Sequence, residues 1–222
     1  RQMCIRDRYN SISHGYWKKM KRVEIIYGGA SNEKEISYLT AKSIYEHIDT
    51  DLYNPGLTDL SKFDPDNFDN ETIFFIAVHG EGGEDGKIQT QLENKKRKFT
   101  GSSSESCILT WDKVATKRAL IANDILTPQF KSIKNNEHFD FNDSFFTENE
   151  HYFVKPNFNG SSYGISKVSD KKFNEALKEA KKYSTEVIIE KSFNGPEYTV
   201  ALLKGKPLTP LQILHDPIRG FY

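Results

Sequence analysis

Apolar and strand-forming residues gather in short runs along this chain, and these runs predict the strands of two sheets. Val23–Tyr27, Phe153–Val154 and Glu186–Ile189 are each rich in residues that favour strands, and Leu52–Leu57 predicts a weaker strand. Ile73–Val78 is apolar at every position. A strand of a covered parallel sheet is buried on both faces, so this run indicates such a strand.

Helical spacing of apolar residues appears in three segments between these strands. Glu33–Ile48 follows a glycine turn and is predicted to be helical, and Cys107–Asn123 is predicted to be a helix broken near Asp112. Lys171–Lys182 is predicted to be an amphipathic helix on the second sheet. The apolar positions are Ile36, Leu39, Ile44 and Ile48 in the first helix, and Phe173, Ala176, Leu177 and Ala180 in the third.

The remaining segments complete a prediction of an α/β fold whose N-terminal part contains an open parallel sheet. Asn135–Glu150 is polar and aromatic without a period and is expected to be a connecting loop. Glu197–Leu203 and Leu208–Leu214 flank a Lys-Gly-Lys-Pro turn and predict a β-hairpin. Residues 1 to 19 show no strand or helix period and no secretory signal, so we expect an extension outside the fold.

The amino-acid composition argues against several classes of function. The chain has 222 residues, of which 36% are hydrophobic, enough for a substantial core and more than one domain. Its 31 basic and 31 acidic residues cancel, which argues against a nucleic-acid partner. The two cysteines, Cys4 and Cys107, suggest no disulfide framework and favour a cytoplasmic protein. No apolar run approaches the roughly 18 residues of a membrane span, so no membrane partner is expected.

The segment from Phe153 to Ile165 is the strongest candidate for ligand chemistry. A strand delivers Lys155, Pro156 ends the strand, and a loop with two glycines and two serines follows. A compact positive charge beside exposed N–H and hydroxyl donors suits a polyphosphate. A lysine-tipped surface hairpin explains the same pattern equally well.

His79 stands at the carboxyl end of the predicted strand 73–78 and precedes a glycine-rich run. In open α/β sheets the ligand crevice lies beyond these strand ends, so His79 is well placed to line a site. Two common phosphate motifs do not fit the run. A Walker A loop would need glycine at Glu81, and the dinucleotide-binding motif would need glycine at Asp85.

The loop after Lys155 also resembles a known family. Lys155-Pro156 followed by Gly160-Ser161-Ser162-Tyr163-Gly164 is similar to the VKP and GSSxG segments of D-alanine-D-alanine ligases, which belong to the ATP-grasp superfamily. Further segments resemble motifs of the same family in the same order. They are Tyr27–Ser37 (LxGGxSxEREVS), His79–Glu93 (ALHGxxGEDGxxQGxLE), Phe99–Ser102 (YTGSG), Asp112–Lys117 (MDKxxxK) and Glu190–Glu197 (EKxLxGxE). The second is the most specific, although Thr90-Gln91 departs from the family's glycine.

This resemblance implies roles for individual residues. Glu33 would hold the ammonium group of the first D-alanine, and His79 would lie beside the substrate. Ser161 would also act in catalysis, because the family links this serine to the glutamate through a tyrosine of its mobile loop. The ATP contacts would be Lys113, Lys155, Gly160, Ser161 and Ser162 at the phosphates, Glu190, Lys191 and Phe193 at the base, and Glu197 at the ribose.

Each of these residues also has a plainer interpretation from the sequence alone. Glu33 fits an acidic residue in the first turn of a helix, where the helix dipole favours it. A histidine at a strand end commonly makes structural hydrogen bonds, and Lys113 and Lys117 fit solvated helix-surface lysines. Glu190 and Lys191 fit a solvated charge pair. The function of Lys117 stays open.

The implied reaction is ATP-dependent ligation of two D-alanines through an acyl phosphate, to supply a peptidoglycan precursor. The alternatives are a related ATP-grasp ligase, such as one that makes D-alanyl-D-lactate, or a non-catalytic nucleotide-binding fragment. The resemblance also implies Mg²⁺ as a cofactor and a homodimer formed through the N-terminal domain.

The resemblance runs from Met20 to Tyr222 and predicts three parts. Residues 20–101 would form the substrate-binding N-terminal domain, residues 102–190 the central ATP-grasp subdomain, and residues 191–222 the start of a C-terminal ATP-grasp subdomain. We expect this last subdomain to be truncated, with the mobile loop and the magnesium ligands of the family beyond Tyr222.

Overall fold

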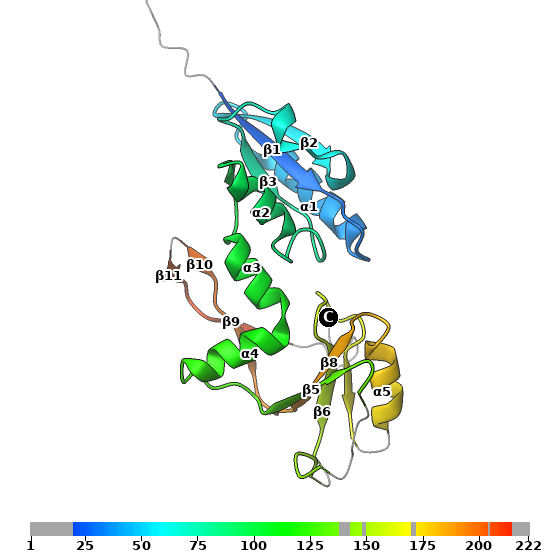
Figure 1. Ribbon diagram of the computed structural model, residues 1–222. Coiled ribbons are helices and arrows are strands. Elements are labelled where there is room, and N and C mark those ends of the chain that lie inside the picture. The colour runs from blue at the N-terminus through cyan, green and yellow to red at the C-terminus, as the bar shows by residue number, and fades with distance from the viewer. Residues whose placement is uncertain (1–19, 138–142, 148–149, 170–171, 204, 215–222) are drawn as a thin grey trace, which may run out of the picture.

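The computed structural model describes residues 20–137, 143–147, 150–169, 172–203 and 205–214. Two four-stranded sheets lie at opposite ends of this part of the chain, with two helices between them (Figure 1). The predicted extension 1–19 lies outside the described residues, as does Cys4, whereas Cys107 is a free thiol. Within the described residues no helix has both the length and the apolar character needed to cross a membrane.

The N-terminal sheet is parallel, as predicted, with strand order β2-β1-β3-β4. Its strands are β1 (Lys21–Tyr27), β2 (Tyr53–Asp59), β3 (Ile73–Ile76) and β4 (Lys98–Phe99). One face packs around Ile26 and Phe74, and the other around Ile25 and Ala77. The prediction that the central apolar strand is covered on both faces is therefore confirmed.

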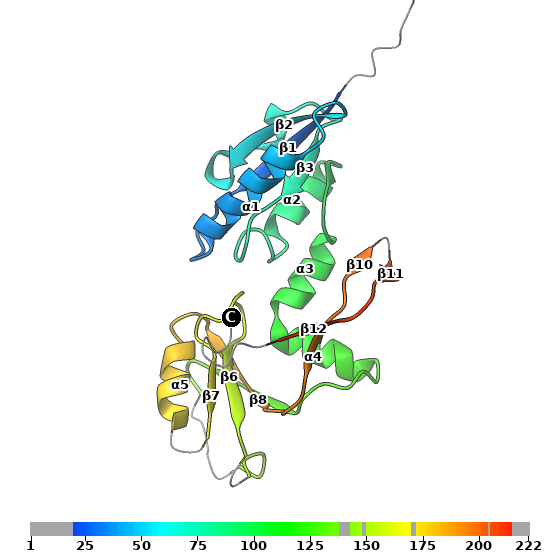
Figure 2. The same ribbon diagram turned by 180° about the vertical axis from the view of Figure 1, so that it is seen from behind.

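Helix α1 (Lys34–His47) covers one face of this sheet (Figure 2), but the predicted contact face was partly wrong. Ile44 and Ile48 pack against the core as expected. Ile36 and Leu39 are instead 53% and 54% exposed. The small residues Ser37 and Ala41 are buried in their place. Small side chains let the helix backbone approach the sheet closely. The prediction considered only the large apolar residues and so missed the buried face.

Two other parts of this domain differ from the sequence prediction. Strand β2 was expected to be weak, yet it pairs with β1 over seven residues. Pro55 is tolerated in it because β2 is an edge strand. Helix α2 (Lys87–Asn94), which follows the glycine-rich run, was not predicted, and it buries Ile88 and Leu92 against the sheet. Short 3₁₀ turns, η1 (Leu60–Lys62) and η2 (Pro65–Asn67), connect β2 to β3.

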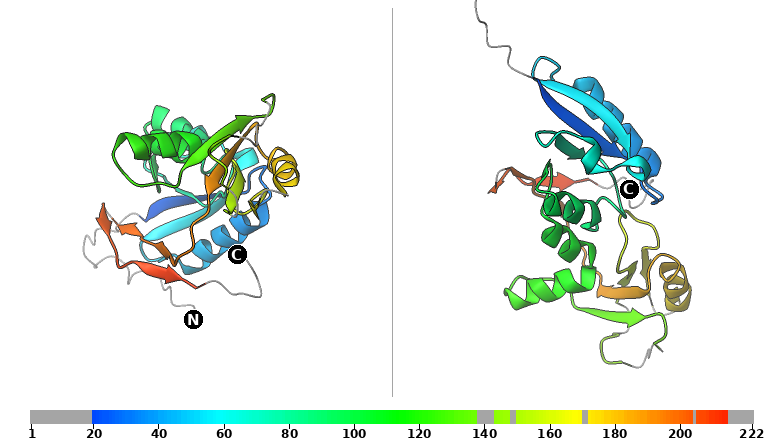
Figure 3. Two further views of the ribbon diagram at one scale, coloured as in Figure 1. Left: turned by 90° about the horizontal axis from the view of Figure 1, so that it is seen from below. Right: turned by 45° about the horizontal axis from the view of Figure 1, so that its top comes forward.

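The second sheet is antiparallel, with strand order β5-β8-β6-β7. Its strands are β5 (Phe130–Lys134), β6 (Tyr152–Pro156), β7 (Ser166–Val168) and β8 (Glu186–Lys191), of which β5 and β7 were not predicted. Helix α5 (Phe173–Ala180) packs its predicted apolar face on one side of the sheet. Helix α4 lies on the other side (Figure 3, left). The connector before β6 contributes Phe145 and Phe146 to the α5 side of the core.

The break predicted near Asp112 separates α3 (Ser104–Trp111) from α4 (Lys113–Ala122). The Asp112 carboxylate accepts a hydrogen bond from the Ala115 backbone N–H at 2.9 Å and so caps α4. The predicted hairpin is also present. Its outer strands are β9 (Glu197–Thr199) and β12 (Leu211–Ile213), and its inner strands are β10 (Leu202–Leu203) and β11 (Lys206–Pro207). The proposed domain boundaries near residues 101 and 190 stay predictions.

Candidate active site

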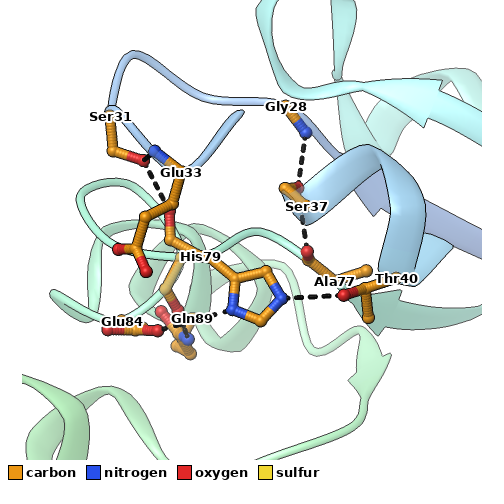
Figure 4. A network of polar contacts seen from close by, with 10 residues as sticks. Gly28, Ser31, Glu33, Ser37, Thr40, Ala77, His79, Glu84 and Gln89 are labelled. Atoms are coloured by element: carbon orange, nitrogen blue, oxygen red, sulfur yellow. Dashed lines mark hydrogen bonds and ion pairs between the residues drawn. The ribbon is translucent and has the colours of Figure 1, made fainter. Parts of the chain in front are cut away.

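His79 lies just beyond β3, where backbone and side-chain hydrogen bonds hold it (Figure 4). Its Nε2 atom is 3.0 Å from Thr40 Oγ1 on α1, and its backbone carbonyl accepts a hydrogen bond from the Ser31 hydroxyl at 2.9 Å. Its Nδ1 atom is 4.0 Å from a carboxylate oxygen of Glu84. The imidazole is half-buried.

Glu33 is held at the start of α1 by the same group of contacts. Its backbone N–H donates to the Ser31 hydroxyl at 3.2 Å, and its carbonyl accepts from the Ser37 backbone N–H at 2.9 Å. The buried Ser37 hydroxyl accepts from the Gly28 N–H and donates to the Ala77 carbonyl, both at 2.8 Å. These bonds tie the glycine turn after β1 to the end of β3. They place Glu33 at the carboxyl edge of the parallel sheet together with His79, for which this position was predicted.

The loop after β6 reaches this same edge from the other sheet. A Cβ atom added at Gly160 would lie 3.2 Å from a carboxylate oxygen of Glu33 and 3.2 Å from one of Glu84. The Cα atom of Gly80 would be 3.8 Å away. The missing side chain of Gly160 therefore lets the serine-containing loop lie directly against the two acidic groups.

A small cavity of about 170 Å³ lies where these loops meet. Glu33 and Glu81 line it from the N-terminal domain, and Trp111, Asn159 and Tyr163 are among the residues that line it from the other side. This volume is below the roughly 300 Å³ at which pockets for drug-sized ligands begin. Acidic side chains and small size together suit a small molecule that carries an ammonium group.

Asn157 holds the loop after β6 in place, a role that the sequence did not reveal. Its side chain is fully buried and makes three hydrogen bonds. Its Oδ1 atom accepts from the Val114 N–H at 2.9 Å, and its Nδ2 atom donates to carboxylate oxygens of Asp112 at 3.0 Å and Glu186 at 3.1 Å. The start of α4 and the loop after β6 are thereby fixed to each other. A polar residue directly after a predicted strand end was the only available signal.

Lys113, at the first position of α4, reaches under the same loop. Its ammonium group donates to the backbone carbonyls of Asn157 at 3.2 Å and Asn159 at 2.6 Å. Burial, followed by the nearby charge of Lys155, lowers the pKa of Lys113 to about 8. The predicted contact of Lys113 with ATP stays a prediction.

Lys155 and Glu190 form an ion pair on the face of the antiparallel sheet opposite α5. The same carboxylate lies 2.8 Å from the ammonium group of Lys117. Burial alone would raise the pKa of Glu190, but the charges and hydrogen bonds of these two lysines lower it below its usual value. The interpretation of Glu190 and Lys117 as solvated surface charges is therefore wrong, because both side chains are largely buried.

The loop residues differ in what their positions permit. Ser161 has a φ of 56° and is exposed, as is Ser162, so a ligand could reach both residues from solvent. Gly164 was predicted to let the backbone approach a ligand. A Cβ atom there would instead lie 2.7 Å from Tyr183 and 2.8 Å from Pro156, so this glycine allows the loop to pack on the protein.

The predicted base and ribose contacts lie where β8 continues into the hairpin. Lys191 pairs with Glu150 at 3.2 Å, and its backbone N–H donates to the Gln129 carbonyl at 3.0 Å. Phe193 is 72% exposed, and Glu197 is exposed at the start of β9. The structure therefore brings Glu33, His79 and Gly160 together, and it gathers Lys113, Lys155 and Glu190. Phe193 and Glu197 belong to neither group and are exposed to solvent.

Comparisons with known proteins identify relatives of this chain. A family model described as the D-ala D-ala ligase C-terminus matches residues 121–219. A D-alanine--D-alanine ligase of Ruthia magnifica is 35% identical over 212 residues, which cover 90% of this chain and 67% of that protein. One from Marinomonas sp. is 33% identical over 213 residues, which cover 90% of this chain but 65% of that protein. This chain thus spans about two thirds of the length of these relatives.

A solved structure shows the same architecture. The D-alanine--D-alanine ligase of Bacillus anthracis, complexed with ATP, superposes with a TM-score of 0.79 at 28% identity. The match covers 89% of this chain and 67% of that chain. The predicted α/β fold with an ATP-grasp domain is confirmed by this likeness.

Proposed function

Because this chain belongs to the D-alanine-D-alanine ligase family, we propose that its reaction is the ATP-dependent joining of two D-alanines through an acyl phosphate. One observation carries the proposal. Gly160, in the loop that follows Lys155, lies against the carboxylates of Glu33 and Glu84. A group that binds an amino acid and a loop suited to phosphate thus share one site, as transfer of a phosphoryl group to a carboxylate requires.

Glu33 binds the ammonium group of the first D-alanine in this proposal. Glu33 and Glu84 make the edge of the site acidic, and Coulomb attraction favours a cation there. The cavity of about 170 Å³ beside Glu33 accommodates a small amino acid. His79 does not line this cavity, but Ser31, which donates to its carbonyl, does. In the proposal His79, held also by Thr40, lies beside the substrate and helps to orient it. Proton transfer by His79 is not part of the proposal.

The residues around the loop fit the phosphates of ATP. Lys113 and Lys155 supply two positive charges, and Ser161 and Ser162 supply exposed donors. Lys113 and Lys155 lie close enough for the charge of one to lower the pKa of the other, so they can bind one anion together. When bound, ATP supplies the phosphoryl group that activates the substrate carboxylate. The protein groups orient that carboxylate, stabilise the negative charge and exclude water.

Glu190, Lys191, Phe193 and Glu197 would hold the base and ribose of ATP. The relative from Bacillus anthracis that was solved with ATP supports nucleotide binding at this fold. Among the described residues no group of three or more His, Cys, Asp or Glu could hold a metal ion. We therefore assign no step to Mg²⁺.

The wider role follows from the chemistry. In the proposal the dipeptide product serves as a precursor of peptidoglycan, and the reaction takes place in the cytoplasm, where ATP is available. A homodimer formed through the N-terminal domain remains part of the proposal. The relatives are named D-alanine--D-alanine ligases and do not favour D-lactate as the second substrate.

D-alanine-dependent release of ADP by the whole protein tests the proposal. Glu33→Gln should lower kcat/KM for D-alanine at least ten-fold while ATP affinity stays within two-fold, since loss of a charged hydrogen bond costs about 1.5 to 3 kcal/mol. Glu35→Gln, at an exposed position of the same helix, should behave like the parent. ATP binding without any D-alanine-dependent turnover would instead support a non-catalytic nucleotide-binding module.

A further inference from the structure

Glu190 is shared by two lysines that approach it from different elements. Lys155 comes from the neighbouring strand β6, and Lys117 comes from α4. In the sheet register Glu190 lies opposite Phe130 on β5 and opposite Phe153 on β6. Each lysine lies over one of these rings, with Lys117 Nζ 5.2 Å from the centre of Phe130 and Lys155 Nζ 5.2 Å from that of Phe153. The carboxylate is thus flanked by two similar cationic groups.

The two lysines differ in how far they can move. The side chain of Lys117 is 6% exposed, that of Glu190 is 13% exposed, and that of Lys155 is 25% exposed. Lys117 also donates a hydrogen bond to the Thr127 hydroxyl at 2.6 Å, a second contact that holds its ammonium group in place. A ligand at the surface of the sheet can therefore reach Lys155, while Lys117 stays enclosed.

We propose that Lys117 is a positioning residue that keeps Glu190 paired when Lys155 leaves it to bind a phosphate of ATP. This inference rests on the proposed function, because it requires ATP at this face. The two lysines and one carboxylate carry a net charge of +1, since two positive charges face one negative charge. When Lys155 moves to the phosphate, Lys117 and Glu190 remain as a neutral buried pair.

Loss of Lys117 would change this balance. Glu190 would then have Lys155 as its one remaining partner in the trio, and a largely buried carboxylate binds its last counter-charge strongly. Phosphate would have to compete with Glu190 for Lys155. Affinity for ATP should fall, whereas affinity for adenosine, which carries no phosphate, should change little.

Calorimetric titration with ATP and with adenosine tests this prediction. Lys117→Met should raise the Kd for ATP roughly ten-fold and leave the Kd for adenosine within two-fold, as expected for one weakened charged contact. Lys117→Arg, which keeps the charge, should recover most of the ATP affinity. Lys131→Met is the matched control, because it removes another ion pair of the same sheet, that with Asp143.

A second substitution separates charge competition from simple loss of packing. Adding Glu190→Gln to Lys117→Met removes the carboxylate that would retain Lys155, so the ATP-to-adenosine affinity ratio should return toward that of the parent. Equal loss of ATP and adenosine affinity in Lys117→Met, or no recovery in the double variant, would overturn the inference.

Two further outcomes have clear meanings. If Lys117→Met does not fold, Thr127→Val removes the hydroxyl that fixes Lys117 and should give a smaller loss confined to ATP; unchanged ATP affinity in that variant contradicts the inference. A parent protein that binds neither ATP nor adenosine contradicts the proposed function itself. Binding by the parent with equal binding by Lys117→Met contradicts only the role of Lys117.

Discussion

The two sheets contribute to the site in different ways. The parallel N-terminal sheet presents Glu33 and His79 on loops beyond its strand ends, where hydrogen bonds from Ser31 and Ser37 hold the backbone. The antiparallel sheet presents Lys155 and Glu190 from within its strands, where each is held by opposite charge. The parallel side is therefore fixed by neutral hydrogen bonds, whereas the antiparallel side combines the buried Asn157 amide with a balance of charges. The two sides should respond differently to substitution, pH and salt.

The largest effect on stability is expected from loss of Asn157, the buried side chain on which the antiparallel side depends. Asn157→Leu would leave the Val114 N–H and two carboxylates without their amide partner, and we expect a loss of about 2 to 4 kcal/mol in unfolding free energy. Urea unfolding measures this loss. Ser37→Ala is the counterpart on the parallel side and should cost about 1 to 3 kcal/mol, since it removes two buried hydrogen bonds. A larger loss in Ser37→Ala would reverse the comparison.

Removal of the partly exposed charge of Lys155, on the antiparallel side, should have the next largest effect. Lys155→Ala should weaken ATP binding by roughly ten-fold to over a hundred-fold, because a charged contact contributes about 1.5 to 3 kcal/mol. Calorimetry gives the affinity, and Lys167→Ala, at an exposed lysine of β7, serves as control. An unchanged ATP affinity with an intact fold would remove Lys155 from the phosphate site.

ATP affinity measured over a range of pH tests how far the antiparallel side depends on the charge of Lys113. With a pKa of about 8, its amine is mostly charged at pH 7 and mostly neutral at pH 9. ATP affinity should therefore fall about ten-fold between pH 7 and pH 9, and Lys113→Met should lose this dependence. The same group makes the unfolding free energy rise with pH between about 8 and 10.5, where the unfolded chain binds more protons than the folded one. A pH-independent affinity would contradict a phosphate role for Lys113.

The contrast also explains what could be predicted from the sequence. Glu33, His79 and the glycine-rich loops lie in continuous motifs at strand ends, so the resemblance of these motifs to the family could single them out as candidates. Lys117 and Asn157 depend on partners far along the chain, 73 residues away for Glu190 and 43 for Val114. Their sequence neighbours carry no sign of those partners. A buried lysine on a helix has the same local pattern as a solvated one.

Strands β5 and β7 and the contact face of α1 were not predicted correctly for a related reason. Strands β5 and β7 are short edge strands with mixed polar and apolar residues, and the pairing with β8 and β6 defines them. The face of α1 was assigned to its large apolar residues, but close packing selected Ser37 and Ala41. Tertiary contact overrode local preference in each case.

Substitution at Gly160 tests most directly whether the two sheets form one site. Gly160→Ala would place a methyl group 3.2 Å from the carboxylates of Glu33 and Glu84, whereas Gly195→Ala meets no atom within 4 Å. Both variants should be assayed for ADP release at varied D-alanine and ATP. A shared site predicts that Gly160→Ala lowers kcat/KM for D-alanine roughly ten-fold, about 1.4 kcal/mol, while Gly195→Ala matches the parent. Parent-like kinetics in Gly160→Ala would contradict the shared site.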